Sequence, residues 1–433
     1  MKRNRFRQIS QPLSLLALTL SLVLIRPAVA ETDCSAMIQD IQVEGNEKTQ
    51  AKYLIKWSEL QIGQPVSQRD LDRAKQKILN TGLFIEAEVA DNGLCQPQTV
   101  LTLKIREKHY HLIYPRLSRN GDGDIDKGIR YRGNNLFGTD QSLSLLLSKK
   151  DYVSGDSADR IKIDYELNLY ELPYQLRWYY YAADTVLADT LDTLTQETVV
   201  EKDKQLAFLV GRDWHVDFFN QPIAVLAKLE MHNKSLSGSD PDIQTMPGDF
   251  HTIGIQLEYD KVKDEVYRRT GHYHTMEIKR GIYSIGSDSD ATQVKLEARY
   301  YHALNDLDNL NARLIMSLAS GKIFNQYNYT VGGAETLRGI ESDIFYGNGL
   351  WQANLEYVIG YQRWPSFRTA LFTDVGNVFK DAKYINDHDW KQTFGIGLRW
   401  KLTSYVDTDL IIDYAYDPDS GYSKIYAATS LLF

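Results

Sequence analysis

The residues with the clearest potential for specific chemistry lie in a glycine-rich stretch late in the chain. Arg338 stands between Leu337 and Gly339, shortly after the pair Gly332 and Gly333. Glycines adopt the backbone conformations that tight loops require, so this spacing predicts a loop that directs one guanidinium group at a partner. A guanidinium group binds a carboxylate through two parallel hydrogen bonds, which is a strong and directional interaction. We name these five residues the loop-lock motif; the alternative interpretation is an ordinary solvated loop.

Candidate acidic partners for Arg338 lie on two later segments. Residues 367–375 alternate along the chain, and the side that carries most of the apolar residues is predicted to face outward. This alternation directs Asp374 inward, and Gly376 follows it closely. Glu356 stands between two apolar residues and points inward by the same argument. The sequence therefore predicts that the loop folds back and brings Arg338 to Asp374, with Glu356 as a second acidic neighbour.

Such a loop needs a rigid wall, and residues 109–433 have the pattern of one. Residues 161–169, 294–301 and 393–402 alternate apolar side chains with mostly polar or small ones, over more positions than a typical soluble strand contains. One apolar face and one charged face fit lipid outside and water inside. Counting such runs predicts an all-β transmembrane barrel of about 16 antiparallel strands, an even number as bacterial single-chain barrels require. The 28 tyrosines and 7 tryptophans fit aromatic girdles at the membrane interfaces.

Connection lengths predict which end of the barrel carries the loop-lock motif. Short and long connections alternate: the short ones fall at residues 172–173, 305–306, 363–364 and 404–405, and the long ones at 183–202, 233–249, 321–348 and 376–391. Bacterial barrels have short periplasmic turns and long external loops, so we expect the motif in an external loop and both barrel termini on the periplasmic side. The chain ends on Phe433, a candidate C-terminal signal for the barrel-assembly machinery.

The first 30 residues predict the compartment. A basic head precedes an apolar run from Leu13 to Ile25, and Ala28-Val29-Ala30 forms a small-residue cleavage site, as in a secretory signal peptide. The apolar run is shorter than the about 20 residues that a spanning helix needs. A mean hydropathy of −0.39 excludes a helical membrane protein, and a net charge of −8 argues against nucleic-acid binding. We expect a mature chain that begins near Glu31, outside the cytoplasm.

Residues 31–108 differ from the rest and predict a small α+β domain. Residues 37–43 alternate as a strand, a short helix carries Tyr53, Leu54 and Trp57, and strands follow at residues 85–90 and 100–107. Between them a second helix begins at Ser67 with Asp70 as a capping box and ends near Gly82, so the predicted order is β-α-α-β-β. Cys34 and Cys95 are the only cysteines of the chain. In an oxidising compartment they are predicted to form one structural disulfide.

The N-terminal domain resembles a polypeptide-transport-associated (POTRA) domain. The resemblance rests on the order of its elements, on Val43-Glu44-Gly45-Asn46 near its start and on Thr81-Gly82-Leu83-Phe84 before its second strand. POTRA domains lie in the periplasm and receive unfolded chains at a sheet edge, which is a general mode of peptide recognition. The resemblance implies client binding; the alternative is a spacer with no client.

The barrel is similar to a family of transporters. The loop-lock motif, then Glu356, then Phe372-x-Asp374-x-Gly376-Asn377 resembles the signature of the outer-membrane assembly factor and two-partner-secretion transporter superfamily, and so do residues 134–138. The resemblance implies that Arg338 contacts Asp374 on the barrel wall. It also implies insertion or export of polypeptides, with outer-membrane lipid, unfolded clients and periplasmic accessory proteins as partners. Ile340 replaces the usual aromatic residue of the signature, and only one POTRA-like domain precedes the barrel.

Other constellations predict little chemistry. The pairs His109/His111 and His272/His274 have no third ligand nearby in sequence, so polar interface residues are favoured over a metal site. Residues 122–126 begin like a calcium loop but lack its later ligands, which favours a hairpin loop. No nucleophile elbow, phosphate loop or zinc-protease motif is present. We therefore expect no enzyme, no cofactor and no metal. The alternatives are a passive porin or structural barrel, and an outer-membrane hydrolase whose residues meet only in space.

Overall fold

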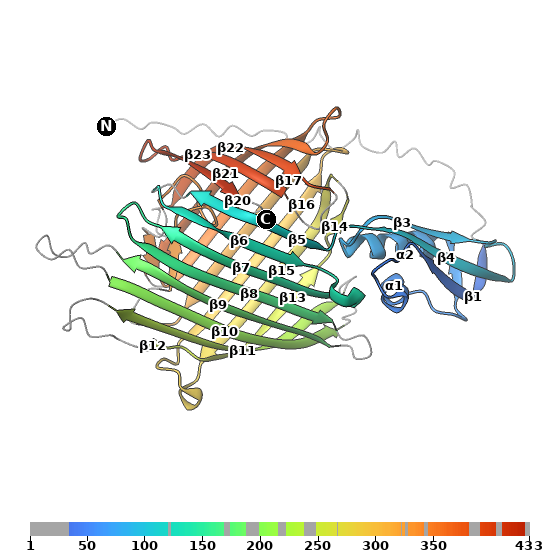
Figure 1. Ribbon diagram of the computed structural model, residues 1–433, viewed down its shortest axis with the longest axis horizontal. Helices are drawn as coiled ribbons and strands as arrows, with labels where there is room; N and C mark the ends of the chain where they lie inside the picture. The colour runs from blue at the N-terminus through green and yellow to red at the C-terminus, as the bar shows by residue number, and fades with distance from the viewer. Residues whose placement is uncertain are drawn as a thin grey trace, which may run out of the picture.

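The chain folds into a small N-terminal domain and a closed β-barrel (Figure 1). The computed structural model describes residues 34–119, 123–168, 174–187, 199–214, 222–237, 248–265, 267–321, 323–324, 328–341, 345–380, 390–403 and 409–428. The predicted signal peptide and Phe433 lie outside these ranges. None of the helices within them has the length and apolar character needed to cross a membrane.

The N-terminal domain is a four-stranded sheet covered by two helices. Its elements are β1 (Ser35–Glu44), α1 (Ala51–Ser58), β2 (Pro65–Ser67), α2 (Gln68–Asn80), β3 (Phe84–Asp91) and β4 (Gln98–Glu107). The strand order is β2-β1-β4-β3, with β1 and β4 parallel and the outer pairs antiparallel. The predicted order β-α-α-β-β omits β2, because a strand of three residues is too short to show an alternating pattern.

Local sequence explains how α2 packs on this sheet. The hydroxyl and main-chain N–H of Ser67 both donate to Asp70, which closes the predicted capping box and lowers the pKa of the Asp70 carboxyl. Leu71, Ala74 and Ile78 then form one buried stripe against the sheet. The helix ends before Gly82, whose φ of +72° suits the left-handed turn that follows.

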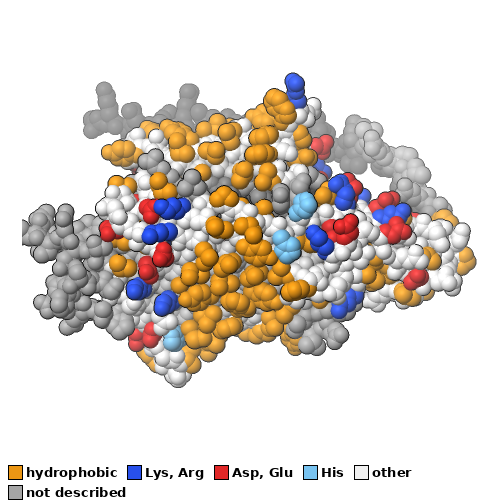
Figure 2. Space-filling view, viewed as in Figure 1, with side chains coloured by type: hydrophobic (Ala, Val, Ile, Leu, Met, Phe, Trp, Pro, Cys, Tyr) orange, Lys and Arg blue, Asp and Glu red, His pale blue; other side chains and the backbone are white. Residues whose placement is uncertain are grey.

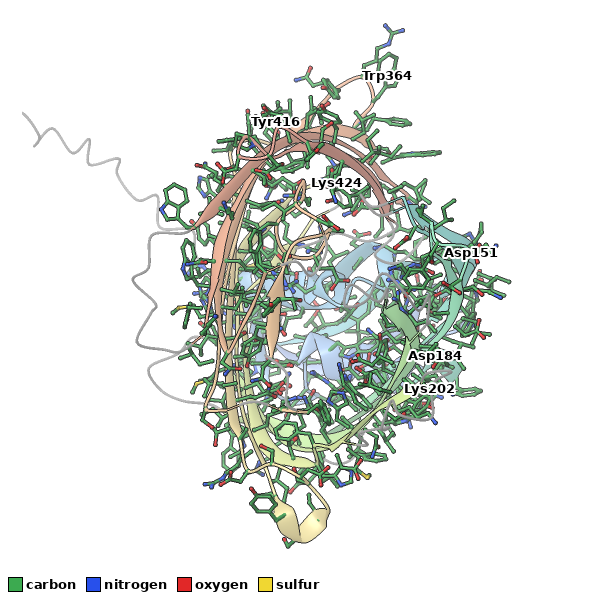
Figure 3. All side chains as sticks on the ribbon, turned by 90° about the vertical axis from the view of Figure 1, so that its left-hand side faces the viewer. Asp151, Asp184, Lys202, Trp364, Tyr416 and Lys424 are labelled. Atoms are coloured by element: carbon green, nitrogen blue, oxygen red, sulfur yellow. A yellow bond between two sulfur atoms is a disulfide. The ribbon has the colours of Figure 1, made fainter. Side chains whose placement is uncertain are left out.

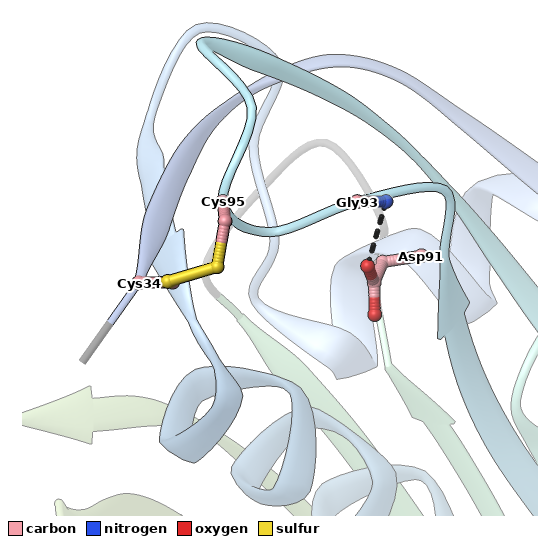
Figure 4. Close-up of a disulfide and its surroundings, with 4 residues drawn as sticks. All are labelled: Cys34, Asp91, Gly93 and Cys95. Atoms are coloured by element: carbon pink, nitrogen blue, oxygen red, sulfur yellow. Dashed lines mark hydrogen bonds between the residues drawn. A yellow bond between two sulfur atoms is a disulfide. The ribbon is translucent and has the colours of Figure 1, made fainter. Parts of the chain in front are cut away.

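The predicted disulfide between Cys34 and Cys95 is confirmed (Figure 4). It joins the start of β1 to the turn between β3 and β4, and the two cysteines are 61 positions apart in the sequence. In the same turn the Gly93 N–H donates to the Asp91 carboxylate at 2.8 Å. The covalent bond therefore fixes the end of the sheet that lies away from the barrel.

The barrel wall confirms the predicted antiparallel architecture. In the described residues, sixteen longer strands close the wall together with the two-residue strands β12 (Gly248–Asp249) and β14 (Lys263–Asp264). The longer strands are β5 (His111–Arg119), β6 (Ile125–Gly133), β7 (Gln141–Asp151), β8 (Ser157–Asn168), β9 (Gln175–Leu187), β10 (Val199–Trp214), β11 (Ile223–Ser237), β13 (Thr252–Asp260), β15 (Arg269–Gly281), β16 (Thr292–Ala303), β17 (Asn309–Ala319), β20 (Gly349–Gly360), β21 (Phe367–Phe379), β22 (Lys391–Lys401), β23 (Asp409–Tyr416) and β24 (Ser423–Ala428). The last strand, β24, neighbours the first, β5.

The two faces of the wall differ in chemistry because side chains alternate along each strand. Figure 2 shows hydrophobic side chains in a broad band across the outside, with charged side chains toward its two ends. Exposed members of this outer face include Leu147, Ile161, Phe208, Leu229, Ile253, Ile255, Leu296, Leu314, Leu355, Leu371, Ile396, Leu398 and Ile412. Many buried charged residues of the wall occupy the alternate positions, in the lumen.

The connections alternate between the two ends of the barrel. The turn between β6 and β7, which holds the short helix η1 (Leu136–Gly138), lies against the N-terminal domain. The connection from β17 to β20 starts at the opposite end and holds a hairpin of β18 (Tyr329–Val331) and β19 (Phe345–Gly347), which sequence patterns missed. The predicted bounds of three long connections are partly wrong. For 183–202, β9 continues to Leu187 and β10 begins at Val199; for 233–249, β11 continues to Ser237 and β12 follows; for 376–391, β21 continues to Phe379. Connections 172–173 and 404–405 lie outside the described residues.

Candidate functional site

The loop-lock motif folds back into the lumen through three glycines. Gly332, Gly333 and Gly339 have φ angles of +125°, +94° and +97°, which other residues rarely adopt. The Thr336 hydroxyl donates to the Gly332 carbonyl and accepts from the Gly332 N–H, both at 2.9 Å. The Gly333 N–H donates to the Ile340 carbonyl at 3.2 Å, which closes the turn. This closed turn holds the two sides of the motif together.

Apolar packing fixes the turn against the barrel wall. Leu337 and Ile340 are buried with Val331 of β18 and Leu350 of β20. Leu337 is fully buried and Ile340 is 3 % exposed, so the departure from an aromatic residue at position 340 does not leave the loop tip loosely packed. Burying such side chains contributes about 1.5–3 kcal/mol each, which favours the folded-in loop.

Arg338 binds both carboxylate oxygens of Asp374, a residue of β21. Its Nε donates to Oδ2 and its Nη2 to Oδ1, each at 2.8 Å, and the Arg338 main-chain N–H also donates to Oδ2 at 3.1 Å. Arg338 is 1 % exposed and Asp374 is fully buried, so water competes little for these bonds. The guanidinium carbon lies 3.4 Å from the ring centre of Phe372, in a cation–π contact.

Strand register decides which wall residue supports Asp374. Asn354 of β20 stands directly opposite Asp374, while Glu356 stands opposite Phe372, two positions further along. The Asn354 amide donates to Asp374 Oδ1 and to the Thr336 carbonyl of the loop, both at 2.9 Å. Asn354 therefore ties the carboxylate and the loop backbone together.

Glu356 belongs to the cluster through a second arginine. Arg399 of β22 donates to Glu356 and to Asp413 of β23, and all three side chains are buried. Asp413 in turn accepts from Nη1 of Arg338 at 2.9 Å. Glu356 therefore acts on Arg338 through its charge, while its described hydrogen bond goes to Arg399. Two guanidinium groups and three carboxylates form one network.

The loop also contacts the last strand of the barrel. The Gly339 N–H donates to the Tyr426 hydroxyl of β24 at 3.0 Å. A Cβ at Gly339 would lie 3.3 Å from the Tyr416 main chain, and a Cβ at Gly376 would lie 2.9 Å from the Trp351 carbonyl oxygen. The loop thus contacts β20, β21, β23 and β24, in the part of the wall that ends at the β24–β5 junction.

Sequence reasoning missed Asp413, Arg399, Asn354 and Tyr426. The alternation of residues 393–402 already places Arg399 on the lumen face, but no pattern indicates which charge it meets across strands. In the described part of the chain, no three acidic, histidine or cysteine side chains are grouped as metal ligands. The arrangement is suited to holding a loop in place.

Comparison with protein families identifies the barrel. The Omp85 superfamily domain matches residues 135–416, which is more than half of the chain. The protein belongs to the Omp85 superfamily. The family described as POTRA, surface antigen variable number repeat, matches residues 36–108. No curated protein sequence matches the chain.

Solved structures agree with this fold. CdiB from Escherichia coli is 12% identical with a TM-score of 0.68, covering 90% of this chain and 76% of its own. CdiB from Acinetobacter baumannii is 15% identical with a TM-score of 0.66, covering 90% and 73%. BamA from Haemophilus ducreyi lacking POTRA domains 1–3 is 17% identical with a TM-score of 0.54, covering 91% and 84%.

Omp85 membership defines the compartment and the general role. The barrel lies in the outer membrane, and the POTRA domain lies in the periplasm. The family supports a role in outer-membrane protein assembly or secretion in general, and its transporters and assembly factors are in general not enzymes. The barrel end that contacts the POTRA domain is therefore periplasmic, and the loop-lock motif enters the lumen from the external end.

Proposed function

We propose that this Omp85 protein captures unfolded client polypeptides through its POTRA domain and inserts them into, or moves them across, the outer membrane. The observation that carries the proposal is the buried network in which Arg338 joins an external loop to β21 and β23. A pore for small solutes does not need a loop held in its lumen by several buried charges. Burying charges is costly unless each is paired, so the network indicates a defined loop position.

The POTRA sheet offers an edge for client capture. Strand β3 lies at the end of the sheet and, among the described strands, pairs only with β4. Its eight residues provide more main-chain groups than the three of β2 at the other edge. An extended client can add to such an edge through main-chain hydrogen bonds, which tolerate many side chains. This suits a carrier of varied polypeptides.

Cross-linking in cells tests the capture step. A photo-reactive amino acid in place of Glu88, which is exposed on β3, is expected to cross-link to client polypeptides. The matched control is Lys75, which is exposed on α2 of the same domain and should give little product. Mass spectrometry of the adducts identifies the clients. Equal labelling from both positions, or none from either, would contradict capture at the β3 edge.

Depletion tests the function as a whole. Removing the protein from cells is expected to reduce at least one outer-membrane, surface or secreted protein, measured by quantitative proteomics of the membrane and medium. Re-expression of the wild-type protein should restore the level of that client. The Arg338→Ala variant should not restore it, because its loop no longer binds in the lumen. If no such protein is lost and small-solute permeability falls instead, the protein is a passive barrel and the proposal fails.

A further inference from the structure

The POTRA domain and the barrel are joined by more than their linking chain. The loop 46–50, between β1 and α1, contacts the turn 134–140, between β6 and β7. The Gln50 N–H donates to the Gly138 carbonyl, and the Gln50 amide donates to the Phe137 carbonyl, both at 3.1 Å. On the POTRA side, Glu107 accepts from the Thr49 N–H at 2.8 Å and holds the loop on its own domain.

A buried trio of polar side chains lies at the centre of this contact. Asn135 of the barrel turn donates from its amide to the Thr49 hydroxyl of the POTRA loop at 2.7 Å. The same Thr49 hydroxyl lies 3.0 Å from the Tyr110 hydroxyl, and all three side chains are at most 4 % exposed. A buried polar group without its partner costs about 1–3 kcal/mol, so the trio favours one relative orientation of the two domains.

The barrel turn has a constrained backbone that fits this role. Asn135, Phe137 and Asp140 have φ angles of +51°, +57° and +58°, which are uncommon for residues other than glycine. Gly138 has a φ of +68°, and a Cβ there would lie 2.0 Å from the Lys48 carbonyl oxygen of the POTRA loop. Strained backbone of this kind persists only where the surrounding structure holds it. Here the surrounding structure includes the other domain.

We propose that loop 46–50 and turn 134–140 form an interdomain latch, in which Thr49 and Asn135 are positioning residues that hold the POTRA sheet in one orientation at the periplasmic mouth of the barrel. Viewed along the barrel from its external end, the POTRA domain lies behind the lumen (Figure 3). The latch thus sets where a captured strand is presented. The importance of that orientation for transport rests on the proposed function; the orientation itself does not.

Distance measurement between the domains tests the latch. The full chain has no free cysteine among its described residues, because Cys34 and Cys95 are bonded, so spin labels attach only at introduced cysteines. Labels at Lys75 of the POTRA domain and Leu304 of a periplasmic barrel turn report the interdomain distance in detergent micelles. We expect one narrow distance peak in the wild type and a broadened or displaced peak in the Thr49→Val variant, which keeps shape and removes the hydroxyl.

Matched substitutions separate the latch from general damage. Thr81→Val removes a part-buried hydroxyl whose described bonds stay within the POTRA domain, away from the latch, and it should keep the wild-type peak. Gly138→Ala should displace the POTRA domain, whereas Gly155→Ala adds a similar backbone strain with nothing within 4 Å and should not. Wild-type peaks in both Thr49→Val and Gly138→Ala would overturn the latch. Altered distance peaks with unchanged client transport would overturn the positioning role of the latch. If the wild-type protein transports no client at all, the proposed function fails and the latch itself still stands.

Asp140 adds a further contact between the barrel turn and the POTRA domain. Its carboxylate accepts from Asn168 of β8 at 2.9 Å and from Trp57 of the POTRA domain, and it faces Glu166 and Lys56. Burial, with Glu166 adding, raises the pKa of Asp140 from 3.8 to about 6. The two POTRA groups that face it, Trp57 and Lys56, act in the opposite direction and favour its charged form. The carboxylate therefore contributes to the interdomain contact as a hydrogen-bond acceptor.

Discussion

Replacing Arg338 with alanine is expected to release the loop from the lumen and to lower the free energy of unfolding of the barrel by about 3–5 kcal/mol. The physical reason is the loss of one partner from a buried ionic network. Asp374 and Asp413 both accept from Arg338, and both are buried. The variant removes the guanidinium group that binds both oxygens of Asp374, and it leaves Asp413 paired with Arg399 alone. Urea unfolding in detergent, followed by tryptophan fluorescence, measures the change in free energy, and proteinase K digestion reports whether the loop is still protected.

Two control variants locate the effect in the network. Arg177→Ala removes another lumen arginine, whose side chain is 26 % exposed, so a smaller loss is expected because water replaces much of the interaction. Glu356→Gln removes a carboxylate that binds Arg399, but Arg399 still donates to Asp413. The loop should therefore stay protected from proteinase K. Arg338→Lys should behave like the alanine variant in digestion, because an ammonium group cannot bind both Asp374 oxygens in the guanidinium geometry. A protected loop in Arg338→Ala would contradict the role assigned to this residue.

Reduction of the Cys34–Cys95 disulfide is expected to lower the free energy of unfolding of the POTRA domain by about 4 kcal/mol. The bond joins residues 61 positions apart, and cross-linking a long segment limits the unfolded chain more than the folded one. A domain of this size has a small core, so a loss of this magnitude is a large part of its stability. Hydrogen exchange of β1 and β4, followed by mass spectrometry with and without dithiothreitol, measures the change.

The barrel provides an internal control for this experiment. The chain has only two cysteines, and both lie in the POTRA domain, so dithiothreitol should leave exchange in the barrel strands unchanged. A variant with serine at both positions should show the weakened domain in either condition. If dithiothreitol leaves exchange in β1 and β4 unaltered, the disulfide does not contribute to the stability of the folded domain.

Patterns that repeat along the chain predicted the barrel, since lipid and water impose them on every strand. Alternation in residues 161–169 or 393–402 indicates which face meets lipid without any knowledge of neighbouring strands, because successive side chains point to opposite sides. The same alternation directed Asp374 into the lumen. Local signals worked equally well where they are self-contained, as at the capping box of Ser67 and Asp70. Short elements such as β2 and the β18–β19 hairpin carry too few residues for such a signal.

Pairings between distant residues followed only from the folded chain. Asn354 rather than Glu356 stands beside Asp374 because the register of β20 against β21 places it there, and a shift of two residues would exchange them. Asp413 meets Arg338 because β21, β22 and β23 curve around the same lumen. In the same way Thr49 meets Asn135, 86 positions away in sequence, through the docking of two domains.

The sequence by itself therefore determined the compartment, the two kinds of domain, the disulfide and the arginine that enters the lumen. Each depends on residue type and local spacing, which water, lipid and redox conditions act upon directly. The tertiary structure alone decided which carboxylates compensate Arg338, which strand receives Gly339, and how the POTRA domain is held. Those contacts depend on strand register and barrel closure, and the free energy that selects among registers is spread over the whole wall.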